Sequence, residues 1–205
     1  MIKIINTVCV FCAASNNVDS VYYDEAFLLG KLLAESGREL LFGGGSVGLM
    51  GSVADGAISK NGKVTGVIPE FLDNLELGHK RIDKMHVVDS MHSRKNKLLK
   101  ESDCIIALPG GCGTFEELLE AITWKRLGLI ISPVIIVNIK NYYDPLIEML
   151  ERSIREKFMR EEYHKTWVVV SNATEAIELI NNDLEIHNFE EDTLIKEADF
   201  AKNKK

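Results

Sequence analysis

Two glycine-rich turns in the sequence have the composition of a phosphate-binding site. The first spans Gly43–Gly51 (GGGSVGLMG) and the second spans Pro109–Thr114 (PGGCGT). Each follows a short apolar run and leads into a helical pattern, so backbone N–H groups and the positive end of a helix dipole would meet there. Glycine also lets the backbone approach a phosphate without a side chain in the way. The pair predicts a nucleotide or sugar-phosphate site.

The first turn matches more than one pattern. Gly43-x-Gly45-x-x-Gly48 is the dinucleotide-binding fingerprint, and Glu70 lies about where its ribose-binding acid would be. Gly44-x-Ser46-x-Gly48 is the nucleophile elbow of hydrolases, with Ser46 as the nucleophile. A Walker A loop is excluded because no Gly-Lys-Ser/Thr follows. A further alternative is a tight strand–helix turn in which glycine serves packing.

The second turn continues as Thr114-Phe115-Glu116-Glu117 and allows two interpretations. Thr114-x-x-Glu117 is a capping box, in which Glu117 would serve the amino end of the helix. Alternatively, Glu117 is a carboxylate at the mouth of the cleft, facing the ligand that the glycines hold. The spacing leaves both alternatives open.

A basic helix follows a third apolar run. The segment Ser90–Lys95 (SMHSRK) places Arg94 and Lys95 near the amino end of that helix, where the dipole disfavours cations. Cations in that position need a compensating anion, either an acidic side chain or a ligand. The alternative is a solvated basic face that also includes Lys97 and Lys100. His92 has the position of a surface or capping residue.

Alternating apolar and amphipathic segments must position these residues. Short runs rich in Val and Ile predict strands at 3–11, 39–42, 63–68, 85–88, 104–108, 134–139 and 167–170. Helical patterns lie between them at 19–36, 47–60, 90–102, 115–127, 145–157 and 174–181. This alternation predicts a Rossmann-like, doubly wound α/β domain with a parallel sheet of about seven strands and helices on both faces. We expect one domain over 1–182 and a charged tail over 183–205, as a peripheral helix, a partly disordered segment or a dimer contact.

Composition narrows the possible partners. The 205 residues carry 24 Lys and Arg against 31 Asp and Glu, a net charge of −7, which disfavours a duplex nucleic-acid binder. No apolar run reaches the length of about 18 residues that crosses a membrane. Cys9-x-x-Cys12 suggests a redox pair or half a zinc site, but further ligands at suitable spacing are missing, so small core residues are favoured. We expect a cytoplasmic protein without a metal.

Together the motifs resemble a known family. Ser-Met-His-x-Arg-Lys at 90–95, followed by Pro-Gly-Gly-x-Gly-Thr-x-x-Glu at 109–117, is similar to the LONELY GUY family of cytokinin riboside 5′-monophosphate phosphoribohydrolases. Members of this family are often mislabelled lysine decarboxylases. The likeness runs from about Val8 to Thr174 and includes the first glycine turn and the segments Gly66–Pro69 and Ala121–Trp124. One departure is Cys12-Ala13-Ala14-Ser15, where the family has Cys-Gly-Ser-Ser.

The resemblance implies an activity and a set of site residues. It implies a Rossmann-like homodimer that hydrolyses the N-glycosidic bond of AMP-type nucleotides, giving a free base and ribose 5-phosphate without metal, NAD or pyridoxal phosphate. Arg94 and Glu117 would be the catalytic pair. The expected substrate-binding residues are Gly44, Gly45, Ser46, Glu76, Met91, Lys95, Gly111, Cys112, Gly113, Thr114, Phe115, Glu116 and Thr123.

Two other functions remain as alternatives. The first is a non-catalytic nucleotide or cofactor carrier with the same fold, which can share the second glycine motif. The second is an NAD(P)-dependent oxidoreductase that uses the first glycine turn and leaves 109–117 unexplained. A lysine decarboxylase is disfavoured because no Schiff-base lysine with a cofactor cradle is recognisable.

Overall fold

A computed structural model describes residues 5–75 and 77–182 of the chain, so the predicted tail at 183–205 lies outside the described residues. Its strands form one parallel sheet with the order β4-β3-β2-β1-β5-β6-β7. The strand bounds are β1 Thr7–Phe11, β2 Glu39–Phe42, β3 Val64–Pro69, β4 Lys84–Val88, β5 Cys104–Ala107, β6 Val134–Val137 and β7 Trp167–Val170. This arrangement confirms the predicted doubly wound sheet.

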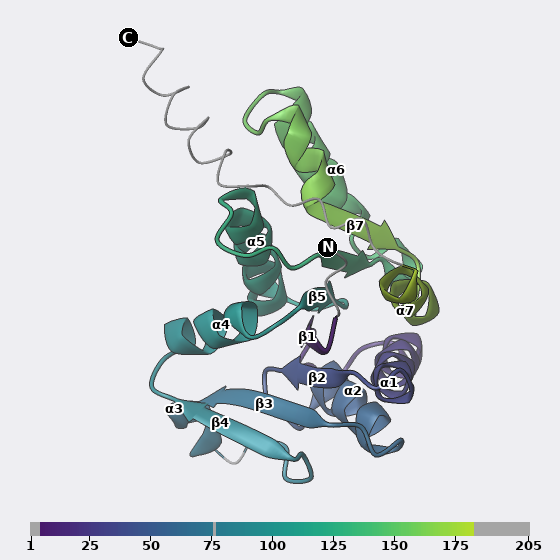
Figure 1. Ribbon diagram of the computed structural model, residues 1–205, viewed down its shortest axis with the longest axis vertical. Helices are drawn as coiled ribbons and strands as arrows, with labels where there is room; N and C mark the ends of the chain where they lie inside the picture. The colour runs from purple at the N-terminus through teal and green to yellow at the C-terminus, as the bar shows by residue number, and fades with distance from the viewer. Residues whose placement is uncertain (1–4, 76, 183–205) are drawn as a thin grey trace.

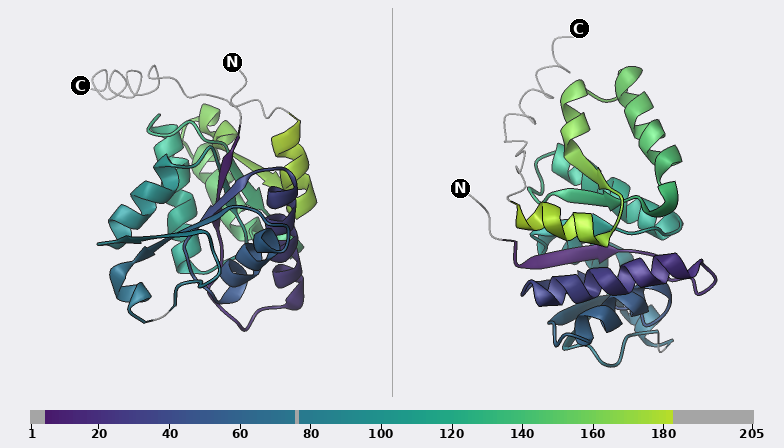
Figure 2. Two further views of the ribbon diagram at one scale, coloured as in Figure 1. Left: turned by 60° about the horizontal axis from the view of Figure 1, so that its bottom comes forward. Right: turned by 90° about the vertical axis from the view of Figure 1, so that its right-hand side faces the viewer.

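Helices cover both faces of the sheet (Figure 1). One core cluster joins the sheet to α1 (Ser20–Glu35), α2 (Gly48–Ile58) and α7 (Ala173–Asn181). A second cluster joins the opposite face to α4 (Met91–Lys100), α5 (Cys112–Arg126) and α6 (Asp144–Arg155). Figure 2 shows α1 and α7 together on one side of the sheet. Because helices cover both faces, the central strands are apolar along their whole length, as the sequence shows.

The six predicted helices begin and end within three residues of their predicted bounds, and a side chain caps the amino end of α1, α4 and α7. The Asp19 side chain accepts a hydrogen bond from the Val21 amide at the start of α1, and Gly37 follows this helix with a φ of 73°. The short helices α3 (Glu70–Asp73), η1 (Ile139–Asn141) and η2 (Glu161–Thr166) were not predicted. They are too short to give a clear hydrophobic period.

The sheet has its topological switch point between β1 and β5. From β1 the chain adds β2, β3 and β4 on one side, and β5, β6 and β7 on the other. The connections after β1 and β5 therefore leave the carboxyl edge toward opposite faces, and ligands of open α/β sheets bind in the crevice that this leaves. The candidate site lies at this crevice.

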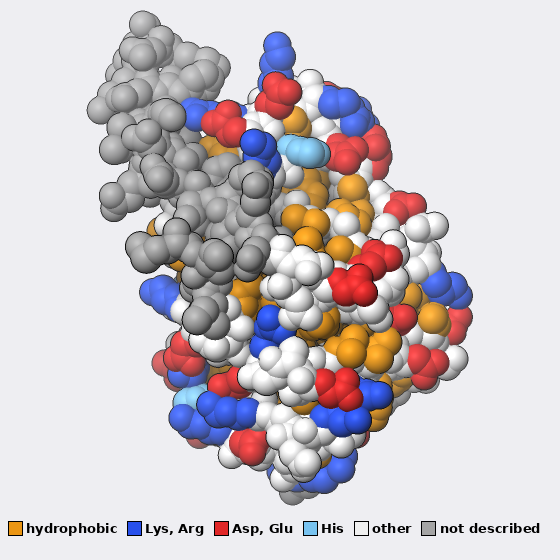
Figure 3. Space-filling model, turned by 45° about the vertical axis from the view of Figure 1, so that its right-hand side comes forward, with side chains coloured by type: hydrophobic (Ala, Val, Ile, Leu, Met, Phe, Trp, Pro, Cys, Tyr) orange, Lys and Arg blue, Asp and Glu red, His pale blue; other side chains and the backbone are white. Residues whose placement is uncertain are grey.

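Charge on the visible surface is mixed. In Figure 3, acidic and basic side chains are interspersed over the face turned toward the viewer, with apolar side chains between them. That pattern differs from the continuous basic surface that a duplex nucleic acid requires. Within the described residues, no helix combines the length and the apolar character needed to cross a membrane.

Candidate active site

A cavity of about 320 Å³ opens at the carboxyl edge of the sheet. Four segments meet around it: the loop after β1, the first turn of α2, the amino end of α4 and the amino end of α5. The lining residues are Cys12, Ala13, Ala14, Ser15, Met50, Met91, Arg94, Gly111, Gly113, Thr114, Glu116 and Glu117. The residues predicted as the catalytic pair, Arg94 and Glu117, thus lie in one cavity with the second glycine turn.

Arg94 is buried and held by the ends of two strands. Ser90 caps α4 by accepting a hydrogen bond from the Ser93 amide, which fixes where the helix begins. From the first turns of α4, the Arg94 guanidinium donates through Nε to the Val67 carbonyl oxygen at 3.2 Å and through Nη2 to that of Gly43 at 3.3 Å. Its remaining nitrogen, Nη1, lies 3.5 Å from Glu117 Oε1. Of the two compensating anions that the sequence allows, an acidic side chain or a ligand, the structure shows the acidic side chain, Glu117.

Gly43 makes this approach possible. A Cβ atom at position 43 would lie 2.0 Å from Arg94 Nη2, inside any allowed contact distance. The close approach of Arg94 therefore explains the first glycine of the GGGSVGLMG turn.

Glu117 belongs to the body of α5. This helix begins at Cys112, with Gly111 as its N-cap and no side chain capping it. Thr114 thus lies inside the first turn, and of the two alternatives for Glu117 the capping box is wrong, because the helix starts earlier than its apolar pattern. Glu117 is buried instead on the side that meets Arg94.

Burial and charge act on Glu117 in opposite directions. Removal of the carboxyl group from water raises its pKa to about 7, and the positive charge of Arg94 only partly offsets this effect. The carboxylate of Glu116 raises the pKa further. At neutral pH Glu117 therefore exists both as a carboxylate and as a carboxylic acid, a state that suits proton transfer.

Lys95 connects α4 to α5 beside the cavity. Its Nζ lies 2.5 Å from Glu116 Oε1 and 3.0 Å from Glu120 Oε2, and the hydrogen bond to Glu116 raises the pKa of the lysine. Lys97 pairs with Glu101, the C-cap of its own helix, and its side chain is 23% exposed. The cations of this segment therefore have different partners, because Arg94 and Lys95 contact acidic residues of α5, whereas Lys97 contacts the C-cap residue of α4.

The glycines and Ser46 of the first glycine turn pack against protein, and Met50 is the residue of this turn that lines the cavity. The Gly44 carbonyl accepts from the His79 amide at 2.9 Å, and Ser46 donates through both its amide and its hydroxyl to the Leu77 carbonyl. The amides that open α2 are also engaged: that of Gly48 with Asn16 Oδ1, and those of Leu49 and Met50 with the Ala13 carbonyl. Packing, one alternative left open by the sequence, explains this turn, and Gly44, Gly45 and Ser46 lie outside the cavity lining.

Of the other residues predicted to bind substrate, some line the cavity and some do not. Met91 lines the cavity, whereas Cys112 is exposed next to it and Thr123 is exposed almost two turns beyond Glu117. The Phe115 ring stacks on Tyr142 at 6.3 Å and meets Tyr143 edge-on at 6.1 Å, so it serves an aromatic cluster rather than the cavity. Glu76 lies outside the described residues.

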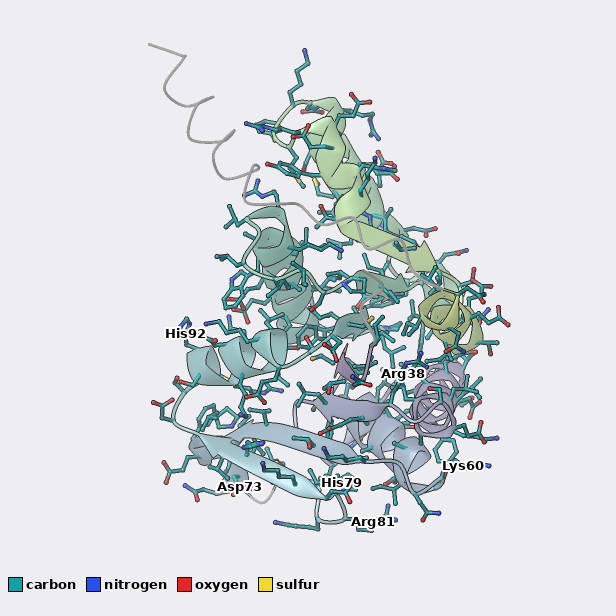
Figure 4. The ribbon with its side chains drawn as sticks, in the orientation of Figure 1. Arg38, Lys60, Asp73, His79, Arg81 and His92 are labelled. Carbon is teal, nitrogen blue, oxygen red and sulfur yellow. The ribbon has the colours of Figure 1, made fainter. Side chains whose placement is uncertain are left out.

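Among the described residues, no histidine lines the cavity, and Cys12 is the only cysteine that does. His92 lies at the outer end of α4, and His79 lies with Arg81 at a distance from that helix (Figure 4). His79 Nε2 is instead 3.0 Å from Asp55 Oδ1. Cys12 lines the cavity, but burial raises the pKa of its thiol strongly, which keeps it protonated. Among residues 5–75 and 77–182, no three His, Cys, Asp or Glu side chains are grouped as metal ligands would be.

Two tyrosines behind the second glycine turn were missed by sequence reasoning. The Tyr143 hydroxyl donates to the Leu108 carbonyl at 2.7 Å, and the Tyr142 hydroxyl donates to the Gly110 carbonyl at 2.6 Å. Both come from the segment between β6 and α6. Their contribution depends on which strands are neighbours in the sheet, and the sequence carries no local signal for that.

The fold and the site together define a Rossmann-like α/β protein whose switch-point cavity combines a buried Arg–Glu pair with a glycine-rich helix start. The family profile described as "Possible lysine decarboxylase" matches residues 50–180. Probable cytokinin riboside 5′-monophosphate phosphoribohydrolase LOGL2 of Oryza sativa subsp. japonica is 40% identical over 171 residues, covering 83% of this chain and 70% of the relative. Cytokinin riboside 5′-monophosphate phosphoribohydrolase LOG2 of Arabidopsis thaliana is 37% identical over 180 residues, covering 88% and 84%. The chain therefore belongs to the LONELY GUY (LOG) family.

Solved structures share the fold. The molybdenum cofactor binding protein from the phototrophic bacterium Rippkaea orientalis matches with a TM-score of 0.69 at 25% identity, covering 87% of this chain and 96% of that one. The molybdenum cofactor carrier protein of Chlamydomonas reinhardtii matches with a TM-score of 0.65 at 22% identity, covering 88% and 98%. The second likeness speaks for the architecture alone.

Proposed function

We propose that this protein hydrolyses the N-glycosidic bond of AMP-type nucleotides, cytokinin riboside 5′-monophosphates or AMP, to a free base and ribose 5-phosphate. The observation that carries this proposal is the buried Arg94–Glu117 pair, 3.5 Å apart at the wall of the cavity. Membership of the LOG family supports it, since the relatives are named phosphoribohydrolases. We further propose that the enzyme is a cytoplasmic homodimer needing no metal or organic cofactor.

Glu117 would act on the reacting centre. As the bond between C1′ of the ribose and the base nitrogen breaks, positive charge develops on the sugar, as in other glycoside hydrolyses. The Glu117 carboxylate would stabilise that charge and accept a proton from the attacking water, whose oxygen bonds to C1′. A proton acceptor with a pKa of about 7 is well matched to this role at neutral pH. The base leaves with the bonding electron pair and takes up a proton from solvent.

The second glycine turn would bind the 5′-phosphate. Gly111, Gly113 and Thr114 line the cavity at the start of α5, where the helix dipole and the first amides favour an anion. Phosphate binding away from the bond that breaks supplies energy that is used at the reacting centre. Nucleoside monophosphates should therefore be substrates, and adenosine a poor one.

The direct test is product analysis. The purified protein is incubated with AMP, with N6-isopentenyl-AMP and with adenosine, and the products are separated by chromatography. We expect free base and ribose 5-phosphate from the monophosphates, and the ratio of the two rates reports recognition of the isoprenoid tail. Comparable rates on AMP and adenosine would contradict the role of the phosphate. Binding of AMP without turnover would favour the carrier, and tight binding of NAD(P) in a fluorescence titration would favour the oxidoreductase.

A further inference from the structure

The peptide group between Gly110 and Gly111 is anchored from outside the cavity. Its carbonyl oxygen, on Gly110, accepts the hydroxyl hydrogen of Tyr142 at 2.6 Å. Tyr142 lies outside the cavity lining and is 39% exposed. Gly111, on the other end of the same peptide, lines the cavity and is the N-cap of α5. One hydrogen bond therefore links a partly exposed tyrosine to the wall of the site.

Because the peptide bond is planar, this hydrogen bond also fixes the direction of the Gly111 N–H. In a planar trans peptide, the C=O of one residue and the N–H of the next point to opposite sides. With the Gly110 carbonyl turned toward Tyr142, the Gly111 N–H is turned away from Tyr142. A Cβ atom at Gly111 would meet nothing within 4 Å, so side-chain sterics do not fix this orientation. Two adjacent glycines could otherwise allow the peptide to flip.

Tyr142 is itself held firmly. The Asn138 side chain accepts from the Tyr143 amide and donates to Asp144 Oδ1, each at 2.7 Å, which closes the turn around Tyr142. Lys140, two residues before Tyr142, has a φ of 53°, which is rare for a lysine and is maintained by the surrounding structure. The tyrosine ring is stacked against Phe115 of α5. The hydroxyl group is thus presented at a fixed place behind the glycine turn.

We propose that Tyr142 is a positioning residue that orients the Gly111 N–H as a hydrogen-bond donor to the 5′-phosphate of the substrate. This inference rests on the proposed function for the identity of the ligand, a sugar phosphate. It also explains why an aromatic cluster is built behind the turn: Phe115, the predicted substrate contact, holds Tyr142 in place instead. Tyr143 has a related but distinct role, because the residue after Leu108 is Pro109, which has no N–H to orient.

The test is Tyr142→Phe, which removes the hydroxyl and keeps the ring. Calorimetric titration with ribose 5-phosphate should show an affinity about tenfold weaker, the loss expected for one hydrogen bond to a charged group. The KM for AMP should rise by a similar factor with a smaller change in kcat, and the affinity for adenine should stay the same. Tyr22→Phe is the matched control, since the Tyr22 ring meets Tyr142 edge-on at 6.1 Å.

The outcomes test the positioning role of Tyr142 and the proposed hydrolysis separately. Wild-type affinity of Tyr142→Phe for ribose 5-phosphate would overturn the role of Tyr142, and so would an equal loss of affinity for adenine and ribose 5-phosphate, which reports general distortion. If the wild-type protein binds ribose 5-phosphate but leaves AMP intact, the proposed hydrolysis fails, while a selective loss in the variant still supports the positioning role. A wild-type protein that does not bind ribose 5-phosphate would overturn the positioning role, whereas the hydrolysis stands or falls with the products formed from AMP.

Discussion

Glu117 is buried beside Arg94, and the positive charge of Arg94 lowers the pKa of Glu117 by less than burial raises it. Its pKa of about 7 means that burial outweighs the attraction of Arg94, whose guanidinium divides its donors between two backbone carbonyls and the carboxylate. A structural ion pair would lower the pKa of its acid. A poised carboxyl group beside a cavity is instead typical of residues that move protons.

Replacement of Glu117 by Gln should separate chemistry from structure. We expect the rate of AMP hydrolysis to fall by roughly 10²-fold or more, because the amide cannot accept a proton from water. Steady-state kinetics measures this loss, and circular dichroism confirms that the fold persists. Glu178→Gln, an exposed position on α7, is the control with the same chemical change. A rate within a few-fold of wild type would remove Glu117 from the mechanism.

The same variant has a stability signature with a defined sign. Because folding raises the pKa of Glu117 from 4.5 to about 7, ionisation of this carboxyl group opposes folding. The resulting loss of stability is absent below pH 4.5, grows between pH 4.5 and about 7, and is fully present above pH 7. Glu117→Gln should therefore raise the free energy of unfolding at pH 8, by on the order of 3 kcal/mol, and change it little near pH 4. Urea unfolding at the two pH values measures the difference. A capping residue would show the opposite, a loss of about 1 kcal/mol at pH 8.

Gly43→Ala should act through Arg94. The added methyl group would lie 2.0 Å from Nη2, so the guanidinium must leave the Gly43 carbonyl and move away from Glu117. Because Arg94 lowers the pKa of Glu117, this movement should raise that pKa. Carbon-detected NMR titration of the carboxyl group measures the shift, and Arg94→Gln should move it in the same direction. An unchanged pKa in Gly43→Ala would show that the arginine stays in place.

At the level of elements, two segments with the spacing of a capping box behave differently. At α7, Asn172-x-x-Glu175 has this spacing: the Asn172 side chain accepts from the Glu175 amide, and Glu175 accepts from the amide of Ser171, one residue before the N-cap. At α5 the helix begins at Cys112, before Thr114. Glycines at the start of a helix carry no apolar period, so the pattern alone could not reveal those first residues. The position of Glu117 in the interior of α5 follows from this difference.

Asn172→Ala should weaken α7 without touching the site. We expect a loss of about 1 kcal/mol in the free energy of unfolding, as for other N-cap replacements, with unchanged kinetics on AMP. The cap lies on α7, which packs on the face of the sheet opposite α4 and α5. Urea unfolding and kinetics on the same preparation test both parts, with exposed Thr174→Ala as control. A changed KM would show that α7 communicates with the cavity.

For the whole molecule, the sequence reveals the layers but not their order. Alternating strands and helices predict a doubly wound sheet, and the resemblance to the LOG family singles out Arg94 and Glu117. The strand order decides which loops line the cavity. Because β1 and β5 are neighbours, the loop at Cys12–Ser15 lines the cavity, whereas Gly44, Gly45 and Ser46 lie outside the lining. The tyrosines behind β5 depend likewise on β6 lying next to it. Long-range adjacency of this kind leaves no local pattern.

The last prediction concerns association of whole chains. Leu119, Leu129 and Ile131 lie on and directly after α5 with exposed fractions of 38%, 56% and 45%. Exposed apolar patches are typical of contact surfaces. We expect a homodimer that uses this surface. Size-exclusion chromatography with light scattering should give twice the mass of one chain for the wild-type protein, and the mass of one chain for the double variant Leu119→Glu, Leu129→Glu. Phe158→Glu changes a side chain that is 79% exposed just beyond α6 and should leave the dimer intact. A wild-type protein with the mass of one chain, or a double variant that stays dimeric, would contradict this interface.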